Sequence, residues 1–107
     1  MDGFVHINEL NFNEEVLQSS TPVLLEFGGV WCKPCKDLEP LLLRLGGNWK
    51  ERVKLAKLDV TECPGLTTQY QVLSLPTTIL FIEGKAKEYI VGLIPEKRIR
   101  DSIDPYL

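Results

Sequence analysis

The order of strand-like and helix-like segments predicts an α/β protein with one mixed sheet between two helical layers. Five short apolar segments read as strands, and helical spacing of three and four residues separates the first three of them. Helices between successive strands indicate parallel crossovers, whereas a tight turn joins the last two strands into a hairpin. The 107 residues suit a single domain, which we expect to span residues 1–107.

The first quarter of the chain predicts two strands and a short helix. Residues 4–7 read as a short strand, and Asn11 is expected to cap a helix that runs to Gln18. Residues 23–27 form the next strand, which is apolar at both alternating positions apart from Glu26. Such a strand is typical of a sheet covered on both faces.

A long helix is expected to follow Gly28-Gly29. Pro40 inside this helix predicts a kink, and Gly46-Gly47 weaken its far end. A strand at residues 53–60 comes next. Apolar residues three and four positions apart predict the buried stripe of the helix: Leu38, Leu41, Leu42, Leu45 and Trp49.

The remaining elements are a short helix, a hairpin and a final helix. The helix is expected at residues 64–70, and strands at 78–82 and 87–91 are joined by a tight turn at Glu83-Gly84. Pro95 suits the first turn of the final helix. The apolar positions of that helix are Ile99 and Ile103.

Composition disfavours several classes of function. Twelve basic and fifteen acidic residues are interleaved without a basic stripe, which argues against nucleic-acid binding. No basic segment followed by a long apolar run opens the chain, and no apolar run is long enough for a membrane span. Three cysteines do not make a secreted disulfide framework. We expect a cytoplasmic monomer in which any disulfide is transient.

The segment from Trp31 to Lys36 carries the strongest chemical signal. Cys32 and Cys35 lie three positions apart, close enough on one helical turn to form and break a disulfide. Free N–H groups and the helix dipole should lower the pKa of Cys32 at the helix start, and Lys33 adds positive charge. Pro34 is tolerated in that first turn. Cys32 is therefore predicted to attack a substrate disulfide, and the shielded Cys35 to resolve the mixed disulfide.

Two charged residues interrupt apolar strands. A buried Glu26 would have a raised pKa and could exchange a proton with a thiol. Lys57 has the same strand parity as Val53 and Leu55, and a neighbouring ammonium would make burial of the carboxylate tolerable. Whether Glu26 and Lys57 meet is left open at this point.

These motifs, the order of elements and the proline positions together resemble the thioredoxin family over essentially the whole chain. The resemblance implies the thioredoxin fold, with a central five-stranded mixed sheet and helices on both faces in a three-layer sandwich. It also implies a protein-disulfide oxidoreductase that binds no cofactor and receives electrons from NADPH through a flavin-containing thioredoxin reductase. The matching residues are Phe27, Trp31-Cys32-Lys33-Pro34-Cys35-Lys36, Pro40, Lys57, Asp59, Pro64, Tyr70, Pro76-Thr77, Gly84 and Gly92.

The resemblance also implies roles for residues outside the cysteine motif. Pro76 would be a cis-proline facing the disulfide, and Leu75 would offer its backbone to an extended substrate segment. Trp31 and Gly92 would line an apolar substrate groove with these two residues. Glu26 takes the place of the family's buried aspartate. The partners that the resemblance implies for the protein are thioredoxin reductase and disulfide-containing substrate proteins.

Three departures from the family pattern bear on how the couple is tuned. Lys33 replaces the usual glycine, so Lys33, Pro34 and Lys57 are expected to tune the redox pair, with Lys33 raising the reduction potential. Glu26 is one methylene longer than aspartate. Gly28-Gly29 replace an aromatic-alanine pair, which removes a large side chain beside the site.

Other functions compete with a disulfide reductase. A raised potential would suit an oxidase or isomerase, an intact fold could act as a non-catalytic binding subunit, and a glutathione-using role is weaker. A structural zinc site needs about four ligands, and only Cys63 and His6 could join the cysteine pair, so no metal is expected. Cys63 is expected to be an unpaired thiol, and His6 a strand or surface residue.

Overall fold

The five strands form one mixed sheet, as the sequence predicts. The computed structural model describes residues 2–107, and the strand order across the sheet is β1-β3-β2-β4-β5. Strands β1 and β2 run parallel to β3, whereas β4 is antiparallel to β2 and β5 is antiparallel to β4. The strands span Val5–His6 (β1), Val23–Gly28 (β2), Lys54–Asp59 (β3), Thr77–Ile82 (β4) and Lys85–Val91 (β5).

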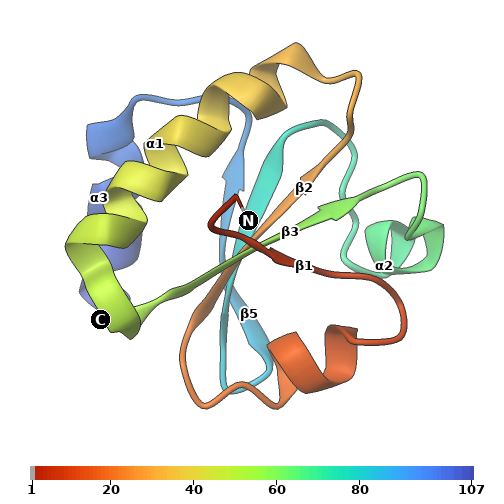
Figure 1. Cartoon of the computed structure of the whole chain (residues 1–107), viewed down its shortest axis with the longest axis horizontal. Helices are drawn as coiled ribbons and strands as arrows, with labels where there is room; N and C mark the ends of the chain where they lie inside the picture. Colours follow the sequence, from red (N-terminus) through yellow and green to blue (C-terminus); the bar gives the residue numbers. More distant parts are fainter. Residues whose placement is uncertain (1) are drawn as a thin grey trace.

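Helices cover both faces of this sheet (Figure 1). On one face α1 and α3 pack on a core that includes Leu24 of β2. On the other face η1 and α2 pack on a core that includes Leu25 and Phe27. The helices span Asn13–Leu17 (η1, a single π-helical turn), Lys33–Trp49 (α1), Lys50–Arg52 (η2), Pro64–Gln69 (α2), Glu96–Ile103 (α3) and Asp104–Tyr106 (η3). The three-layer prediction is confirmed, and no helix within residues 2–107 is long and apolar enough to cross a membrane.

Strand β2 lies at the centre of the sheet and is buried along its whole length. Because side chains alternate along a strand, Glu26 points to the same face as Leu24, which packs against the α1 side. Residue pairing between β2 and β3 places Lys57 directly beside Glu26. The charged interruptions noted in the sequence therefore share one face, beneath α1.

Helix α1 buries the predicted apolar stripe apart from Leu41, which is partly buried, and it continues through Pro40 and both glycines. A Cβ atom at Gly46 would lie 2.6 Å from Cδ1 of Leu55 in β3. Glycine at this position thus lets the end of the helix approach the sheet closely. The indole N–H of Trp49 donates a hydrogen bond to Asp104 at 2.7 Å, which ties the end of α1 to the C-terminal segment.

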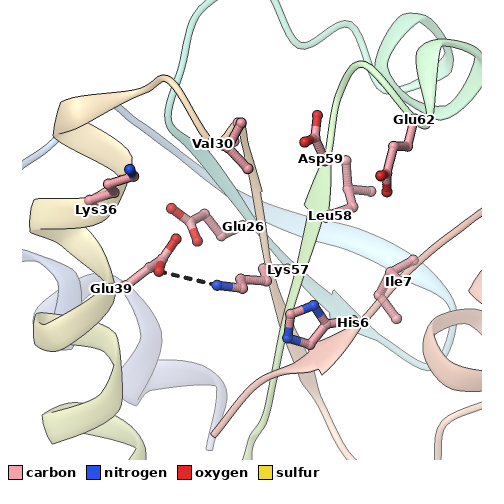
Figure 2. Close-up of a pocket in the computed structure, with 12 residues that line it drawn as sticks. His6, Ile7, Glu26, Val30, Lys36, Glu39, Lys57, Leu58, Asp59 and Glu62 are labelled. Carbon is pink, nitrogen blue, oxygen red and sulfur yellow. Dashed lines mark hydrogen bonds and ion pairs between the residues drawn. The ribbon is translucent and has the colours of Figure 1, made fainter. Parts of the chain in front are cut away.

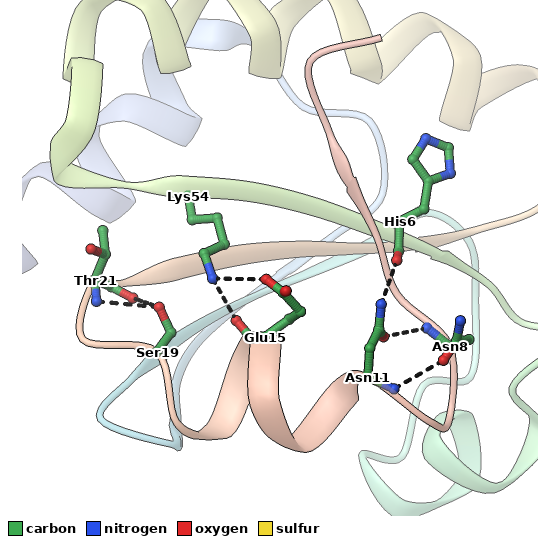
Figure 3. A network of polar contacts seen from close by, with 7 residues as sticks. All are labelled: His6, Asn8, Asn11, Glu15, Ser19, Thr21 and Lys54. Atoms are coloured by element: carbon green, nitrogen blue, oxygen red, sulfur yellow. Dashed lines mark hydrogen bonds and ion pairs between the residues drawn. The ribbon is translucent and has the colours of Figure 1, made fainter. Parts of the chain in front are cut away.

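The first helix differs from its prediction in both type and cap. It spans Asn13–Leu17, whereas the sequence predicts a helix capped by Asn11 that runs to Gln18, and the Asn11 side chain does not cap it. Instead Asn8 accepts hydrogen bonds from the backbone N–H groups of Leu10 and Asn11, at 2.8 and 2.9 Å, while the Asn11 amide donates to the His6 carbonyl (Figure 3). Asparagine side chains commonly satisfy nearby backbone groups in this way, and here the turn competes with a regular helix start.

The other elements agree with their predicted bounds to within a residue or two. The β4–β5 hairpin turns at Glu83 and Gly84, which both have positive φ angles of 52° and 80°. Two positive φ angles match the twist of a tight hairpin connection. Pro95 stands just before α3 as its N-cap rather than inside the first turn.

Candidate redox site

The cysteine pair lies at the N-terminus of α1, as the sequence predicts. Cys32 is the N-cap residue, and its Sγ accepts a hydrogen bond from the backbone N–H of Cys35 at 3.2 Å. Cys32 and Cys35 form a disulfide with their Cα atoms 5.3 Å apart. An N–H donor and the positive end of the helix dipole favour a thiolate at Cys32 when this bond is reduced.

The two sulfurs differ in their access to solvent. Cys32 keeps 7% of its surface exposed and Cys35 only 1%. The order agrees with a nucleophile at Cys32 and a shielded partner at Cys35. Cys32 is nevertheless more covered than the expected exposed nucleophile, because its sulfur points into the helix terminus and is bonded to Cys35 in this oxidised form.

The charge of Lys33 is directed away from the sulfurs. Its ammonium contacts both carboxylate oxygens of Asp37, one turn along the exposed side of α1, at 2.8 and 2.9 Å. This exposed pair places a negative charge beside the ammonium that the sequence alone assigned to the motif. Pro34 follows in the first turn of α1, where its missing N–H leaves no helical hydrogen bond unmade.

The peptide bond between Leu75 and Pro76 is cis, as the resemblance implies. The Pro76 carbonyl accepts a hydrogen bond from the N–H of Gly92 at 2.7 Å, so these two predicted groove residues lie together. Leu75 is half-buried. Trp31 is 58% exposed, and a Cβ atom at Gly29 would overlap the six-membered ring of Trp31. Gly29 therefore leaves the space that the indole occupies.

Sequence reasoning overlooked three exposed apolar residues next to the predicted groove residues in the chain. Each lies one or two residues along the chain from Trp31, Leu75 or Gly92. An apolar residue in a loop beside a suspected binding residue is the signal that would have found them. They are Val30, Leu73 and Leu93, with 74%, 95% and 45% of their surface exposed.

Glu26 is a carboxyl group buried beneath the disulfide. It is 1% exposed, and within residues 2–107 neither of its oxygens accepts a hydrogen bond from a donor group. Burial raises the pKa of Glu26 to about 8, helped by the negative charge of Glu39 and by a hydrogen bond between the two carboxyl groups, and opposed by the positive charge of Lys57. At neutral pH this carboxyl group is therefore mostly protonated.

Lys57 lies beside Glu26 in the sheet but makes its ion pairs elsewhere. Its Nζ atom is 3.2 Å from Oε1 of Glu39 on α1 and 3.1 Å from Oδ2 of Asp2. The sequence left contact between Glu26 and Lys57 open, and the structure forms no ion pair between them. Sequence reasoning missed Glu39, although its position four residues after Cys35 places it on the same side of α1.

Gly28 lies where the disulfide and the buried carboxyl group approach each other. A Cβ atom at this position would be 3.0 Å from the Cys35 sulfur and 3.5 Å from Oε2 of Glu26. The absence of the expected large side chain beside the site is thus accompanied by a tight contact, in which an added methyl group would require the Cys35 sulfur to move. Glycine lets the sulfur and the carboxyl group share one side of β2.

A cavity of about 300 Å³ opens between the first strands and α1 (Figure 2). Glu26, Glu39 and Lys36 face it from one side and the residues of β3 from the other. The cavity is lined by His6, Ile7, Glu26, Gly28, Gly29, Val30, Lys36, Glu39, Lys57, Leu58, Asp59 and Glu62.

The remaining candidate ligands do not join the cysteine pair. Cys63 is a free thiol with no exposed surface, and burial raises its pKa. His6 is an exposed residue whose Nε2 lies 2.9 Å from Asp2. Across residues 2–107 no three His, Cys, Asp or Glu side chains are grouped as metal ligands.

A disulfide at a helix N-terminus, between unequally accessible cysteines and above a buried carboxyl group, defines a dithiol–disulfide oxidoreductase. The model of the thioredoxin family matches residues 3–105. The chain belongs to the thioredoxin family.

Curated relatives support this assignment. The chain is 38% identical over 101 residues to the chloroplastic M-type thioredoxin of Spinacia oleracea, covering 94% of this chain and 56% of that protein. It is 36% identical to the corresponding protein of Chlamydomonas reinhardtii, covering 72% of it. Thioredoxin 1 of Synechococcus elongatus is 32% identical, with 94% of each chain covered.

Proposed function

We propose that this protein mainly reduces disulfides in other proteins, with residues 1–107 acting as one monomeric thioredoxin domain. The observation that carries the proposal is the Cys32–Cys35 disulfide at the start of α1, with Cys32 the more accessible sulfur. The reaction class follows from the family, and the direction of electron flow is the proposed part.

In the proposed cycle, the Cys32 thiolate attacks one sulfur of a substrate disulfide and displaces the other as a thiolate. Cys35 then attacks the Cys32 sulfur of the mixed disulfide and releases the second substrate sulfur. Two electrons pass to the substrate, and the protein is left with the Cys32–Cys35 bond seen in the structure. Glu26 moves the proton of Cys35 in this cycle, supported by the closeness of both groups to Gly28.

Neighbouring residues are proposed to bind substrate or tune the couple. Trp31, Leu75, Pro76 and Gly92 form the substrate-binding surface, supported by the exposed indole and by the hydrogen bond between Pro76 and Gly92. An extended substrate segment would add its backbone at Leu75, as in other forms of strand addition. The tuning residues are Lys33, Pro34 and Lys57.

The electron donor is proposed to be NADPH, acting through a flavin-containing thioredoxin reductase, with no cofactor bound to this chain. We place the protein in a reducing compartment and propose the cytoplasm, where a catalytic disulfide is transient. The similarity to Thioredoxin 1 of Synechococcus elongatus supports this placement, whereas the spinach and Chlamydomonas relatives are named as chloroplastic.

Two cysteine variants test the mechanism. Cys32→Ser is expected to abolish insulin-disulfide reduction in the presence of a dithiol reductant, because it removes the attacking sulfur. Cys35→Ser is expected to accumulate mixed disulfides that mass spectrometry detects and dithiothreitol releases, because the resolving thiol is gone. Full activity in Cys32→Ser, or trapping at Cys32→Ser and not at Cys35→Ser, would contradict the assigned roles.

An oxidase or isomerase remains the second candidate, because Lys33 occupies the position between the cysteines that tunes the couple. The ion pair of Lys33 with Asp37 weakens this alternative, since it holds the ammonium on the outer side of α1. A redox titration of the Cys32–Cys35 couple distinguishes the two functions. About 30 mV corresponds to roughly 1.4 kcal/mol for two electrons, so a potential near that of the strong oxidants would favour oxidation.

A further inference from the structure

The Lys57 ammonium forms no ion pair with Glu26, its paired residue in the neighbouring strand. Lys57 and Glu26 are paired residues of adjacent parallel strands, and both point toward α1. Side chains at such positions are close enough to form an ion pair. Here the Lys57 Nζ atom lies 3.2 Å from Glu39 and 3.1 Å from Asp2, and within residues 2–107 Glu26 forms no ion pair and accepts no hydrogen bond.

Charged groups from every neighbouring element face Glu26. Figure 2 shows the Glu26 carboxyl group directed toward α1, with the Glu39 carboxylate beside it and the dashed contact running from Glu39 to Lys57. The Cys35 sulfur approaches from the helix start across Gly28. The other titratable groups at the cavity are Lys36 of α1, Asp59 of β3, Glu62 after β3 and His6 of β1.

We propose that Glu39 is a positioning residue for the thiol–disulfide reaction. Its carboxylate holds the Lys57 ammonium away from Glu26, and so keeps Glu26 a neutral proton donor beside the Cys32–Cys35 disulfide. The proposal rests on the proposed function in one respect, namely that Glu26 moves the proton of Cys35. It adds a residue that touches no substrate and acts only through Lys57 and Glu26.

The chemical consequence lies in the step that reduces the protein's own disulfide. A thiolate of a dithiol reductant attacks the Cys32 sulfur and forms a mixed disulfide, and Cys35 leaves with the electron pair of the broken S–S bond. A neutral Glu26 gives its proton to the Cys35 thiolate and becomes a carboxylate. The reverse transfer accompanies attack by Cys35. If Lys57 were paired with Glu26, the carboxyl group would already be ionised and would have no proton to give.

Glu39→Gln tests this inference directly, because it keeps the size of the side chain and removes the charge. Loss of the Glu39 carboxylate removes one of the two ion pairs of Lys57 and leaves the pair with Asp2. It also removes the repulsion on Glu26, and each change lowers the pKa of Glu26. We expect carbon-13 NMR of the oxidised protein to show Glu26 titrating about one pH unit or more below the wild-type midpoint. Glu26→Gln identifies the signal, since it removes that titration.

Asp37→Asn is the matched control. It removes one carboxylate from the same helix, but Asp37 bonds Lys33 and does not contact Lys57. The Glu26 midpoint should stay at the wild-type value in this variant. An unchanged midpoint in Glu39→Gln, or an equal shift in Asp37→Asn, would overturn the inference.

A kinetic measurement connects the titration to the reaction. The rate at which excess dithiothreitol reduces each oxidised protein is compared with wild type at the same pH, so that ionisation of the reagent cancels. If the Glu26 midpoint is one pH unit lower, Glu39→Gln should be reduced at the wild-type rate at pH 6 and about threefold more slowly at pH 7.5. A constant ratio across this range contradicts the role in the reaction. Insulin-disulfide reduction by wild type would then still support the proposed function, so the two failures are distinguishable.

Discussion

Replacing Glu26 with glutamine is expected to stabilise the oxidised protein by about 3 kcal/mol at pH 7. The pKa of Glu26 is about 8 in the folded protein, against an ordinary value of 4.5. Between these two values the folded state binds a proton that the unfolded state releases. The free energy of unfolding therefore falls as pH rises, by about 1.4 kcal/mol per pH unit.

The magnitude of the stabilisation follows from the difference between the ordinary pKa of glutamate and the pH of the measurement. At pH 7 the unfolded carboxyl group lies 2.5 units above its pKa while the folded one is still protonated, which gives about 3 kcal/mol. The decrease in the free energy of unfolding of wild type approaches about 5 kcal/mol above pH 9 and vanishes below pH 4. Glutamine has a similar shape and binds no proton, so the variant lacks this pH dependence.

Guanidinium chloride unfolding of the oxidised protein, followed between pH 4 and 9, measures the effect. The difference between Glu26→Gln and wild type should grow from near zero at pH 4 with the slope given above. Glu14→Gln is the control variant, because it removes a carboxylate at an exposed position of η1 and not a buried one. A Glu26→Gln difference that stays flat from pH 5 to 8 would refute the assignment of a proton to buried Glu26.

Two further predictions concern Gly28 beside the disulfide and Cys63 in the core on the other face of the sheet. Gly28→Ala should lower the free energy of unfolding of the oxidised protein by about 1–3 kcal/mol in denaturant titrations, because the added methyl group would meet the Cys35 sulfur at 3.0 Å. Gly47→Ala in α1, where no atom lies within 4 Å of the Cβ position, is the control and should stabilise the helix by up to about 1 kcal/mol. Equal effects at both positions would contradict the packing argument. Cys63 should react with a thiol reagent far more slowly than the reduced Cys32 until the protein unfolds, since it has no exposed surface and its pKa is raised. Rapid labelling of Cys63 in the native protein would show that its burial is not maintained in solution.

The chemistry of the cysteine pair could be predicted from local sequence because it depends on local geometry. A spacing of three residues and a proline in the first helical turn place both sulfurs at one helix start. The N-cap of the first helix was mispredicted at Asn11, because a second asparagine lies nearby in the sequence. Asn8 and Asn11 are equally good at satisfying backbone groups, and only their three-dimensional arrangement shows that Asn8 holds the turn.

The electrostatic environment of Glu26 could not be predicted in the same way. The sequence identified Glu26 and Lys57 as unusual because both interrupt apolar strands. Which carboxylate binds the ammonium depends on where the N-terminal segment and α1 cross over β3, and these segments are distant in sequence. Contacts over such separations leave no periodic pattern in the chain.

By itself, the sequence determined the α/β class, the mixed sheet, the apolar faces and the redox pair, since hydrophobic periodicity and short motifs are local properties. Only the tertiary structure decided that Glu39 and Asp2 bind Lys57, that Asp37 binds Lys33, and that Gly28 brings the Cys35 sulfur near Glu26. The physical reason is that burial and the charges of distant segments set the protonation of a carboxyl group, and both arise only when those segments pack together.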